Sequence, residues 1–394
     1  MWLKFRHKIV FALLTPILRV FLRVKYHFHS KNYELKKGPY LILYNHQTNL
    51  DPIMVSMSFK GPIYYMANDD LFNIPYISKI IRYLVAPIPK AKSVRDIQAI
   101  KDCIRITKAG GRIAIAPEGN RSYSGRLENI DKAIVKLAKL LNVPVILYNI
   151  KGGYGTNPRF STTLRKGKMY GEVIREISTD ELKLYTDEEL YRIIIKELDF
   201  DDLTLNQKYN GKALAESLES VFYVCPVCGG ISTLVSDKNH LNCTKCGLMV
   251  EYTEELRFKT EDIRFNFDTV NEFYKYQKEY IQNINIDKLK HFDNDVKLRK
   301  IIKFKKREDI MTGKITLNGN GIIISNDETT KVFNLDEIIS LAIVYHNTLI
   351  INLENDKFQI VANERFNALK YLHLFYKIKN EKQGVKDGFL GIWN

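Results

Sequence analysis

Short strand-like runs alternate with helix-like runs between Lys37 and about Phe200, and this alternation constrains the fold more than any other feature of the 394-residue chain. The strand candidates are rich in apolar and β-branched residues, over Tyr40–Tyr44, Ile63–Met66, Tyr83–Ile88, Arg112–Ala116 and Val143–Ile150. The helix candidates repeat apolar residues at helical spacing, over Pro52–Ser58, Pro75–Arg82, Val94–Ala109, Asn129–Leu141 and Thr186–Glu197. Strands that alternate with helices form parallel sheets covered by helices. The sequence therefore predicts an α/β sandwich with a mostly parallel sheet.

A histidine and an aspartate stand close together at the junction of the first strand and the first helix, in Asn45-His46-Gln47-Thr48-Asn49-Leu50-Asp51. Open α/β sheets place their ligands at the carboxyl ends of strands. Asp51 can fold back so that its carboxylate accepts the Nδ1–H of His46, which leaves Nε2 available as a base. The chain contains no Gly-x-Ser-x-Gly elbow and no cysteine in a comparable setting. We therefore expect a histidine base that acts on a nucleophile supplied by the substrate.

A second polar turn follows the strand near residue 115 and reads Pro117-Glu118-Gly119-Asn120-Arg121-Ser122. Together, Asn-His-x4-Asp and Pro-Glu-Gly-x-Arg-Ser resemble the motifs of the PlsC-type glycerolipid acyltransferase family, which includes the 1-acylglycerol-3-phosphate acyltransferases. Three further segments resemble other blocks of this family: Leu71–Pro75, Ala86–Lys90 and Val143–Ile146. The resemblance extends over residues 1–200 and implies the αβ sandwich of that family.

The resemblance implies O-acyl transfer from acyl-CoA or an acyl carrier protein to the hydroxyl of a lysophospholipid, here 1-acylglycerol-3-phosphate, to give phosphatidic acid. His46 would take the proton of that hydroxyl and Asp51 would stabilise the imidazolium, with no acyl-enzyme. Backbone N–H groups of the two motif turns are candidates for stabilising the charge that develops on the carbonyl oxygen. The residues that the resemblance implies for acceptor binding are Lys90, Glu118, Gly119 and Arg121. Of these, Arg121 and Lys90 would face the phosphate.

Two positions depart from the family's pattern. Lys90 stands where the second block usually ends in arginine, and a lysine keeps the charge but lacks the planar fork that suits a phosphate. Leu147 stands where the fourth block often continues with a second proline. These changes concern the acceptor more than the chemistry, so another lysolipid or an acyl-ornithine is an alternative acceptor.

The net charge of +15 is concentrated in the half of the chain that holds the motifs. Residues 1–170 contain 29 Lys and Arg against 9 Asp and Glu, whereas the remaining 224 residues contain 31 against 36. Such a field fits an anionic partner, whether phospholipid headgroups, a phosphorylated substrate, an acyl carrier protein or nucleic acid.

Residues 1–25 are predicted to form a helix in the membrane interface. The uncharged stretch from Ile9 to Leu18 is shorter than the ~20 residues that a spanning helix needs. It does not resemble a signal peptide, because arginines follow the apolar stretch and no cleavage site of small residues comes after it. Interleaved basic and apolar residues favour a helix that attaches the chain to the phospholipid surface, as a peripheral or monotopic protein on the cytoplasmic face of the cell membrane. The alternative is a helix buried against the catalytic domain.

Two Cys-x2-Cys pairs, each followed by glycine, are separated by fourteen residues: Cys225, Cys228, Cys243 and Cys246. This spacing predicts a zinc ribbon in which four thiolates close a tetrahedral, structural Zn2+ site. Disulfide bonds are the alternative, although nothing in the sequence indicates export. The fifth cysteine, Cys103, lies in a helix pattern and is predicted to be a small core residue.

The second half of the chain has other patterns of residues than the first half. We expect the acyltransferase domain over residues 26–200, a connector and the ribbon over 201–255, and a helical connector over 256–296 whose aromatic side chains form a packing face. Residues 297–394 contain a final helix, Asn363–Lys379, after seven strand patterns. These patterns are Lys300–Lys305, Gly313–Leu317, Gly321–Ser325, Lys331–Asn334, Ser340–Tyr345, Thr348–Leu353 and Phe358–Val361. Seven strands closed by one helix resemble a PH-like domain, a fold that often binds lipid or protein surfaces.

Two non-catalytic alternatives differ in the partner that they require. A nucleic-acid-binding regulator would use the ribbon and the basic surface. The ribbon itself is poor in basic residues and both motifs are intact, so we expect no nucleic-acid partner. A membrane-tethered scaffold would bind lipid through the PH-like domain without turnover.

Overall fold

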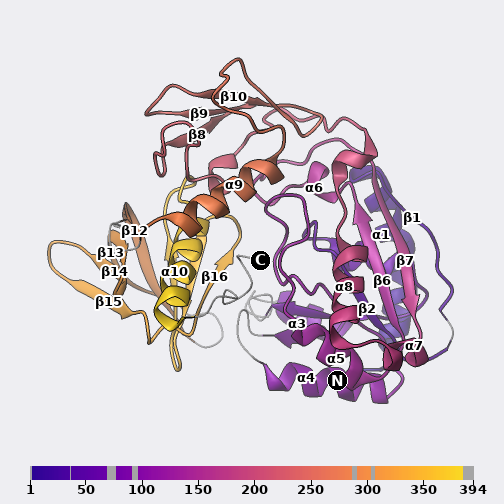
Figure 1. Cartoon of the computed structure of the whole chain (residues 1–394). Coiled ribbons are helices and arrows are strands. Elements are labelled where there is room, and N and C mark those ends of the chain that lie inside the picture. The colour runs from indigo at the N-terminus through magenta and orange to yellow at the C-terminus, as the bar shows by residue number, and fades with distance from the viewer. Residues whose placement is uncertain are drawn as a thin grey trace. The chain divides into compact units, whose positions relative to one another are not determined.

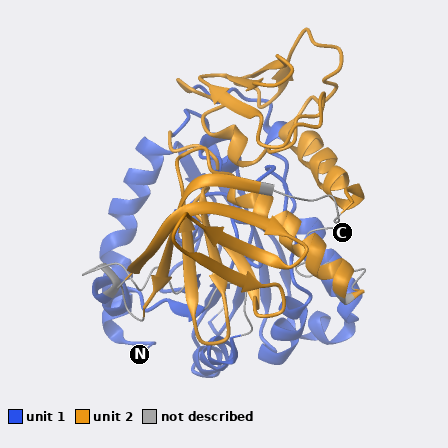
Figure 2. Ribbon diagram, turned by 90° about the vertical axis from the view of Figure 1, so that its left-hand side faces the viewer, with its two compact units in different colours: residues 1–159, 164–210 blue, residues 160–163, 211–394 orange. Residues whose placement is uncertain are grey.

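The computed structural model describes residues 2–35, 37–68, 77–90, 96–285, 291–302 and 307–384. The chain forms two compact units, blue and orange in Figure 2. Unit 1 comprises residues 1–159 and 164–210, and unit 2 comprises residues 160–163 and 211–394. The chain therefore passes between the units at three points of the sequence. The Leu71–Pro75 block lies outside the described residues.

A seven-stranded sheet forms the centre of the described part of unit 1, in the order β1-β7-β6-β2-β5-β3-β4 (Figure 1). Its strands are β1 (Phe28–Ser30), β2 (Leu41–Tyr44), β3 (Tyr64–Asn68), β4 (Ile88–Lys90), β5 (Ile113–Ile115), β6 (Val145–Lys151) and β7 (Met169–Ile177). Among the described strand pairs of this sheet, only β6 and β7 run antiparallel. The predicted α/β class with a mostly parallel sheet is confirmed.

Helices cover both faces of this sheet, which explains why all four residues of the central strand β2 are buried. Leu41 and Leu43 belong to one buried cluster with residues of α4, α5 and α8, whereas Ile42 and Tyr44 belong to another with residues of α1 and α2. The helices of unit 1 are α1 (Phe5–Lys25), α2 (Asp51–Ser56), α3 (Ile77–Leu84), α4 (Ile97–Lys108), α5 (Ala133–Leu141), α6 (Gly153–Thr156), α7 (Thr179–Leu184), α8 (Asp187–Leu198) and the 3-10 helix η2 (Asp202–Leu205).

The prediction of a strand over Tyr83–Ile88 is wrong for every residue except Ile88. Helix α3 continues to Leu84, because the N–H groups of Val85 and Ala86 both bond to the Ile81 carbonyl oxygen and close its last turn. The extended run begins only at Ile88. Strands β1 and β7 escaped prediction altogether. Strand β7 lies near the sheet edge and mixes charged with apolar residues, so it lacks the continuous apolar run of the inner strands.

Helix α1 contacts unit 1 through one face and exposes apolar side chains on the other. His7 and Leu22 are buried, the His7 Nδ1 lies 3.0 Å from the Tyr64 hydroxyl, and Arg19 donates to the Met57 carbonyl oxygen at 2.7 Å. The exposed apolar side chains are Phe5, Ile9, Leu13, Leu14, Ile17, Val20, Phe21 and Val24. Within the described ranges, no helix is both long enough and apolar enough to span a membrane. Helix α1 thus makes the packing contacts expected of a helix buried against the domain, and it also exposes the apolar stripe expected of a helix in the membrane interface.

The described part of unit 2 contains two sheets. The first has the order β11-β10-β9-β8 and consists of β8 (Leu234–Asp237), β9 (His240–Cys243), β10 (Met249–Tyr252) and β11 (Phe258–Lys259). The 3-10 helix η3 (Leu218–Ser220) precedes it, and helix α9 (Val270–Asn283) follows it. The aromatic run around α9 is buried at Phe265, Phe273 and Tyr274, which confirms the predicted packing face.

The second sheet is antiparallel, with the order β15-β14-β13-β12-β18-β17-β16, and is followed by helix α10 (Ala368–Gln383). Its strands are β12 (His291–Ile301), β13 (Arg307–Asn318), β14 (Gly321–Ser325), β15 (Thr330–Asn334), β16 (Ser340–Val344), β17 (Thr348–Asn352) and β18 (Lys357–Val361). The predicted β-rich C-terminal region is confirmed. Strand β12 begins at His291 rather than Lys300, because a bulge between Asp293 and Val296 interrupts the alternation by which strands are recognised.

Residues 160–163 belong to unit 2 although the residues on both sides of them in the sequence belong to unit 1, and Glu216 binds this short segment. Its carboxylate accepts hydrogen bonds from the hydroxyl groups of Ser161 and Thr162, both at 2.6 Å, and from the Thr163 N–H at 3.1 Å. The Phe160 ring contacts Tyr252 edge to face. These contacts explain why the segment belongs to unit 2.

Candidate active site

The first motif forms a turn over residues 45–51, the His46 loop, between β2 and α2. Asn45 fixes the start of this turn. Its side-chain amide donates to the Ile150 carbonyl oxygen at 2.9 Å and accepts from the Ile150 N–H at 2.8 Å. Because Ile150 belongs to β6, the neighbour of β2, these two bonds tie the turn to the carboxyl end of the sheet. The following histidine is thereby placed at the edge where parallel sheets bind ligands.

Asp51 folds back onto the His46 loop and accepts four hydrogen bonds. Its Oδ2 accepts from His46 Nδ1 at 2.8 Å and from the Gln47 N–H at 2.7 Å. Its Oδ1 accepts from the Thr48 N–H at 2.8 Å and from the Thr48 hydroxyl at 2.7 Å. Asp51 is fully buried, whereas the His46 side chain is 24% exposed. A carboxylate only accepts, so it holds the imidazole proton on Nδ1 and leaves Nε2, which makes no hydrogen bond to any described residue, as a base.

Glu118 lies in the turn that follows β5, and its side chain contacts the backbone of the His46 loop. Its Oε1 accepts the backbone N–H of His46 at 2.6 Å, and its Oε2 accepts the backbone N–H of Glu128 at 2.8 Å. The side chain is buried, and this burial raises the pKa of the Glu118 carboxyl group well above its usual range. Both oxygens are engaged by backbone groups, so Glu118 fixes the position of the histidine backbone.

The Arg121 guanidinium joins the second motif turn to the first. Its Nε donates to the Gln47 carbonyl oxygen at 3.1 Å, and its Nη1 donates to the Asn49 side chain at 3.4 Å. Its Nη2 donates to both the carbonyl and the side-chain oxygen of Asn157. Burial lowers the pKa of Arg121 to about 10, which still leaves the group charged at neutral pH. Arg121 therefore contributes a buried positive charge and also holds three segments together.

Gly119 and Lys90 lie at the same edge of the sheet. Gly119 has a φ of 67°, in the left-handed region that glycine adopts without strain, and its N–H closes a turn onto the Ala116 carbonyl oxygen at 3.2 Å. Lys90 ends β4, the outer strand. Strands β2, β5, β3 and β4 are parallel neighbours, so Lys90 lies about three strand spacings, or ~14 Å, from the end of β2.

Besides Asn45 of the first motif, two residues that sequence analysis did not single out also shape this edge: Asn157 and Gly153. A Cβ atom at Gly153 would lie 2.5 Å from the Cβ of Gln47, so glycine is what lets α6 approach the His46 loop. The sequence carries a signal for Gly153, because Gly152-Gly153 follows a strand. Asn157 has no such signal.

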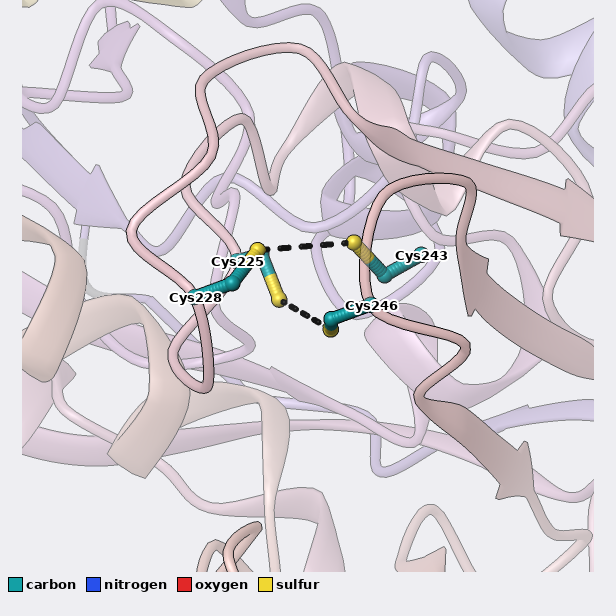
Figure 3. A group of neighbouring side chains, drawn as sticks. All are labelled: Cys225, Cys228, Cys243 and Cys246. Atoms are coloured by element: carbon teal, nitrogen blue, oxygen red, sulfur yellow. Dashed lines mark hydrogen bonds between the residues drawn. The ribbon is translucent and has the colours of Figure 1, made fainter.

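Unit 2 contains a separate cluster of four side chains, shown in Figure 3: Cys225, Cys228, Cys243 and Cys246. Their sulfur atoms lie within 4.8 Å of one another, with 3.7 Å between Cys225 and Cys246 and 3.8 Å between Cys228 and Cys243. None of them is in a disulfide bond. A tetrahedral thiolate site with metal–sulfur bonds of about 2.3 Å separates its sulfurs by about 3.8 Å, so the four side chains fit a zinc ion.

The backbone around each cysteine pair forms a tight turn. Gly229 and Gly247 have φ angles of 64° and 74°, and their N–H groups bond to the carbonyl oxygens of Cys225 and Cys243 at 2.9 and 3.1 Å. These turns bring both thiols of a pair to the same side of the chain. Cys103, by contrast, is buried in the core of unit 1, as predicted.

Comparison with known proteins finds similarity over the first half of the chain. The chain is 28% identical over 163 residues to the 1-acyl-sn-glycerol-3-phosphate acyltransferase of Borreliella burgdorferi, a match that covers 40% of this chain and 64% of that protein. It is 28% identical over 115 residues to a chloroplastic 1-acyl-sn-glycerol-3-phosphate acyltransferase of Brassica napus, covering 29% of this chain and 33% of that protein. The chain thus spans less than two thirds of the length of these curated relatives.

A solved structure is also similar, the 1-acyl-sn-glycerophosphate acyltransferase PlsC of Thermotoga maritima, at 20% identity and a TM-score of 0.43 over 52% of this chain and 83% of that one. The sequence profile of the family described as Acyltransferase matches residues 23–151. This range includes the His46 loop and the turn that carries Glu118 and Arg121. The chain therefore contains an acyltransferase-family domain over residues 23–151.

Proposed function

We propose that the protein transfers a fatty acyl group from acyl-CoA or an acyl carrier protein to the hydroxyl group of 1-acylglycerol-3-phosphate, and so forms phosphatidic acid. The observation that carries this proposal is the His46–Asp51 pair, with 2.8 Å between Nδ1 and Oδ2, inside the acyltransferase-family domain. The similarity to relatives that are 1-acyl-sn-glycerol-3-phosphate acyltransferases supports the choice of acceptor.

In this mechanism, His46 Nε2 takes the proton of the acceptor hydroxyl while the hydroxyl oxygen attacks the thioester carbonyl carbon. Asp51 keeps the ring oriented and stabilises the imidazolium that forms. The tetrahedral intermediate then collapses, the carbon–sulfur bond breaks, and the imidazolium returns the proton to the leaving thiolate. The acyl group passes directly to the acceptor oxygen, so no acyl-enzyme forms. A base of this kind contributes about 10²–10⁴-fold to the rate.

The hydrogen bonds of the two turns narrow the choice of oxyanion donors. The backbone N–H groups of His46, Gln47 and Thr48 are engaged by Glu118 and Asp51. Within the described residues, the N–H groups of Asn49, Asn120 and Arg121 make no hydrogen bond. We therefore infer that the oxyanion donors come from this second set.

The four residues expected at the acceptor site divide into two kinds of role. Glu118 acts as a positioning residue, since both of its oxygens hold backbone groups. Lys90 and Arg121 supply positive charge for the acceptor phosphate, and Gly119 forms the turn that precedes Arg121. The N–H groups of Arg121 are largely used by hydrogen bonds within the protein.

Membrane attachment through α1 is part of the proposal. A stripe of apolar side chains, including Phe5 at 74% and Ile17 at 65% exposure, faces solvent along the helix, and basic side chains flank it. Such a helix lies in the headgroup region with its apolar face inserted. This arrangement brings a lipid acceptor to the acyltransferase domain on the cytoplasmic face of the membrane.

For unit 2, we propose a structural zinc ion at the four cysteines and a PH-like fold for the β-rich region. The sulfur spacing supports the first, and the seven strands followed by α10 support the second. Four protein ligands close a zinc site, so the metal would stabilise the fold without a role in acyl transfer.

The test of the reaction uses the purified chain with detergent-dispersed 1-acylglycerol-3-phosphate and each acyl donor in turn. We expect phosphatidic acid from the wild type and none from His46→Ala, with unchanged thermal unfolding. His29→Ala, an exposed histidine outside the motifs, is the matched control and should keep full activity. Turnover by His46→Ala at the wild-type rate would refute the mechanism. Product from another lysolipid but not from 1-acylglycerol-3-phosphate would move the proposal to that acceptor.

A further inference from the structure

Unit 2 contains a cavity of about 260 Å³ that the proposed acyl transfer does not use. Its walls come from η3, the start of β8, the bulge in β12 and the segment before α10, all within the orange unit of Figure 2. Glu219, Asp293 and Asp295 line it together with Arg365 and the rings of Phe222 and Phe366. We propose that this cavity binds a small primary amine as its ammonium ion.

Glu219 presents an unsatisfied acceptor to the cavity. The residue is only 6% exposed, and its Oε2 atom is buried without a hydrogen-bond partner among the described residues. Its Oε1 atom lies 3.9 Å from the Nε of Arg365, whose own side chain is 65% exposed, so this long ion pair leaves the buried carboxylate only partly satisfied. A buried carboxylate oxygen without a donor is costly, and a ligand that donates a hydrogen bond to it offsets this cost.

The charges around the cavity leave room for one positive charge. Asp293 Oδ2 accepts hydrogen bonds from Lys370 Nζ at 2.6 Å and from the Tyr371 hydroxyl at 2.5 Å, while its Oδ1 makes no hydrogen bond to the described residues. Lys370 and Arg365 offset two of the three carboxylates of Glu219, Asp293 and Asp295. One negative charge therefore remains, and a monovalent cation balances it.

The bulge in β12 delivers two of these carboxylates to the cavity. The pairing of β12 with β13 shifts register between Asp293 and Val296, and Asp295 adopts a φ of 55°. Aspartate tolerates a left-handed conformation better than most residues with a side chain, so Asp295 suits the irregular backbone of the bulge. Bulges of this kind redirect side chains beside binding sites.

The chemistry of the lining favours an ammonium ion over other cations. In the described part of the chain, the four cysteines form the only group of three or more His, Cys, Asp or Glu side chains close enough to hold a metal ion. The carboxylates of the cavity are thus too far apart to coordinate one. An ammonium ion offers three N–H donors from one compact charge, and its attached carbons can lie against Phe222 and Phe366. Because the volume is below the ~300–1,000 Å³ of sites for drug-sized ligands, the amine is small.

The experiment is an NMR titration of the full chain with ethanolamine, followed through the backbone amides of residues 293–295 and 363–367. Ethylene glycol, which lacks the charge, and tetramethylammonium, which lacks N–H donors, are titrated in parallel. We expect saturable shifts with ethanolamine, none with ethylene glycol, and at least ~10-fold weaker binding of tetramethylammonium.

The variants separate the cavity from general surface charge. Glu219→Gln should weaken ethanolamine binding at least ~10-fold, and Asp295→Asn, which keeps a residue tolerant of left-handed φ, should weaken it several-fold. Glu328→Gln, an exposed carboxylate elsewhere in unit 2, is the matched control and should bind as the wild type does. If Glu219→Gln does not fold, Asp295→Asn decides. Equal binding of ethylene glycol, no saturable shift, or unchanged affinity in the deciding variant would each overturn the proposal, whatever the outcome for acyl transfer.

Discussion

Replacing Asp51 by asparagine should stop most of the acyl transfer while leaving a folded protein. The Asp51 carboxylate accepts from His46 Nδ1, from the Gln47 N–H and from two donors of Thr48. An amide has only one acceptor oxygen, so its NH2 group must face the backbone N–H of either Gln47 or Thr48. One buried N–H is then left without an acceptor, which costs about 1–3 kcal/mol of the free energy of unfolding.

The rate should fall in either orientation of the amide. If the oxygen faces Thr48, the NH2 group donates to His46 Nδ1, the ring proton moves to Nε2, and the base is lost. If the oxygen faces His46, the ring keeps its proton on Nδ1, but the imidazolium loses the adjacent negative charge. We therefore expect kcat to fall by about 10²–10⁴-fold.

The assay compares kcat and thermal unfolding with those of Asp202→Asn. Asp202 is a buried carboxylate of unit 1 that accepts the N–H groups of Gly152 and Gly155 at 2.6 and 2.9 Å, and it belongs to neither motif. The Asp202→Asn replacement should cause a comparable loss of stability, because it too leaves a buried N–H unpaired. Its kcat should change by much less than ~10-fold, the factor that corresponds to about 1.4 kcal/mol of activation free energy. Near wild-type kcat for Asp51→Asn, or equal rate losses in both variants, would refute the reasoning.

Three further perturbations test other parts of the structure. The double variant Leu13→Asp and Ile17→Asp changes two positions on α1 that are 64% and 65% exposed. It should weaken binding to anionic vesicles at least ~10-fold without changing thermal unfolding, because each apolar side chain contributes about 1.5–3 kcal/mol when it is buried in the membrane. Vesicle binding as strong as that of the wild type would exclude α1 as the anchor. Removing the metal with a chelator should lower the melting temperature and leave the initial rate per folded molecule unchanged, with metal content followed by elemental analysis; an unchanged melting temperature after verified loss would contradict a structural zinc ion. Burial lowers the pKa of His373 to about 3 from its ordinary 6.5, so the unfolded chain binds a proton that the folded chain does not, and stability should fall by up to ~1.4 kcal/mol per pH unit as pH drops from 6.5 toward 3. His373→Gln should flatten that slope in denaturant titrations, and an equally steep slope in the variant would assign the effect to other groups.

The local patterns of the sequence were sufficient for strands β2, β3, β5 and β6 of unit 1 and for the β-rich region of unit 2, because apolar periodicity directly reflects burial on a strand or helix. They failed where burial is partial. Strand β7, which is second from the edge of its sheet, carries charged residues, and the extra residues at the bulge in β12 break the period of two.

The motif residues could be identified from the sequence, whereas their partners could not. The spacing of His46 and Asp51 is local, so a turn that joins them is predictable. The bonds of Glu118 to the His46 backbone and of Arg121 to Asn157 link residues far apart in the chain, and only the fold brings them together. For the same reason, the family resemblance implies a phosphate-binding role for Arg121 but does not predict that its side chain holds the turns together.

The segment 160–163 bears on how this protein can be divided for study. A cut after residue 210 leaves those four residues in the N-terminal fragment and Glu216 in the other, so the five donors from which the Glu216 carboxylate accepts are lost with them. A C-terminal fragment intended to fold alone would therefore need a substitute for this segment, for example a tethered tetrapeptide. Transplanting either unit into another protein requires the exchange of two separate stretches of sequence rather than one.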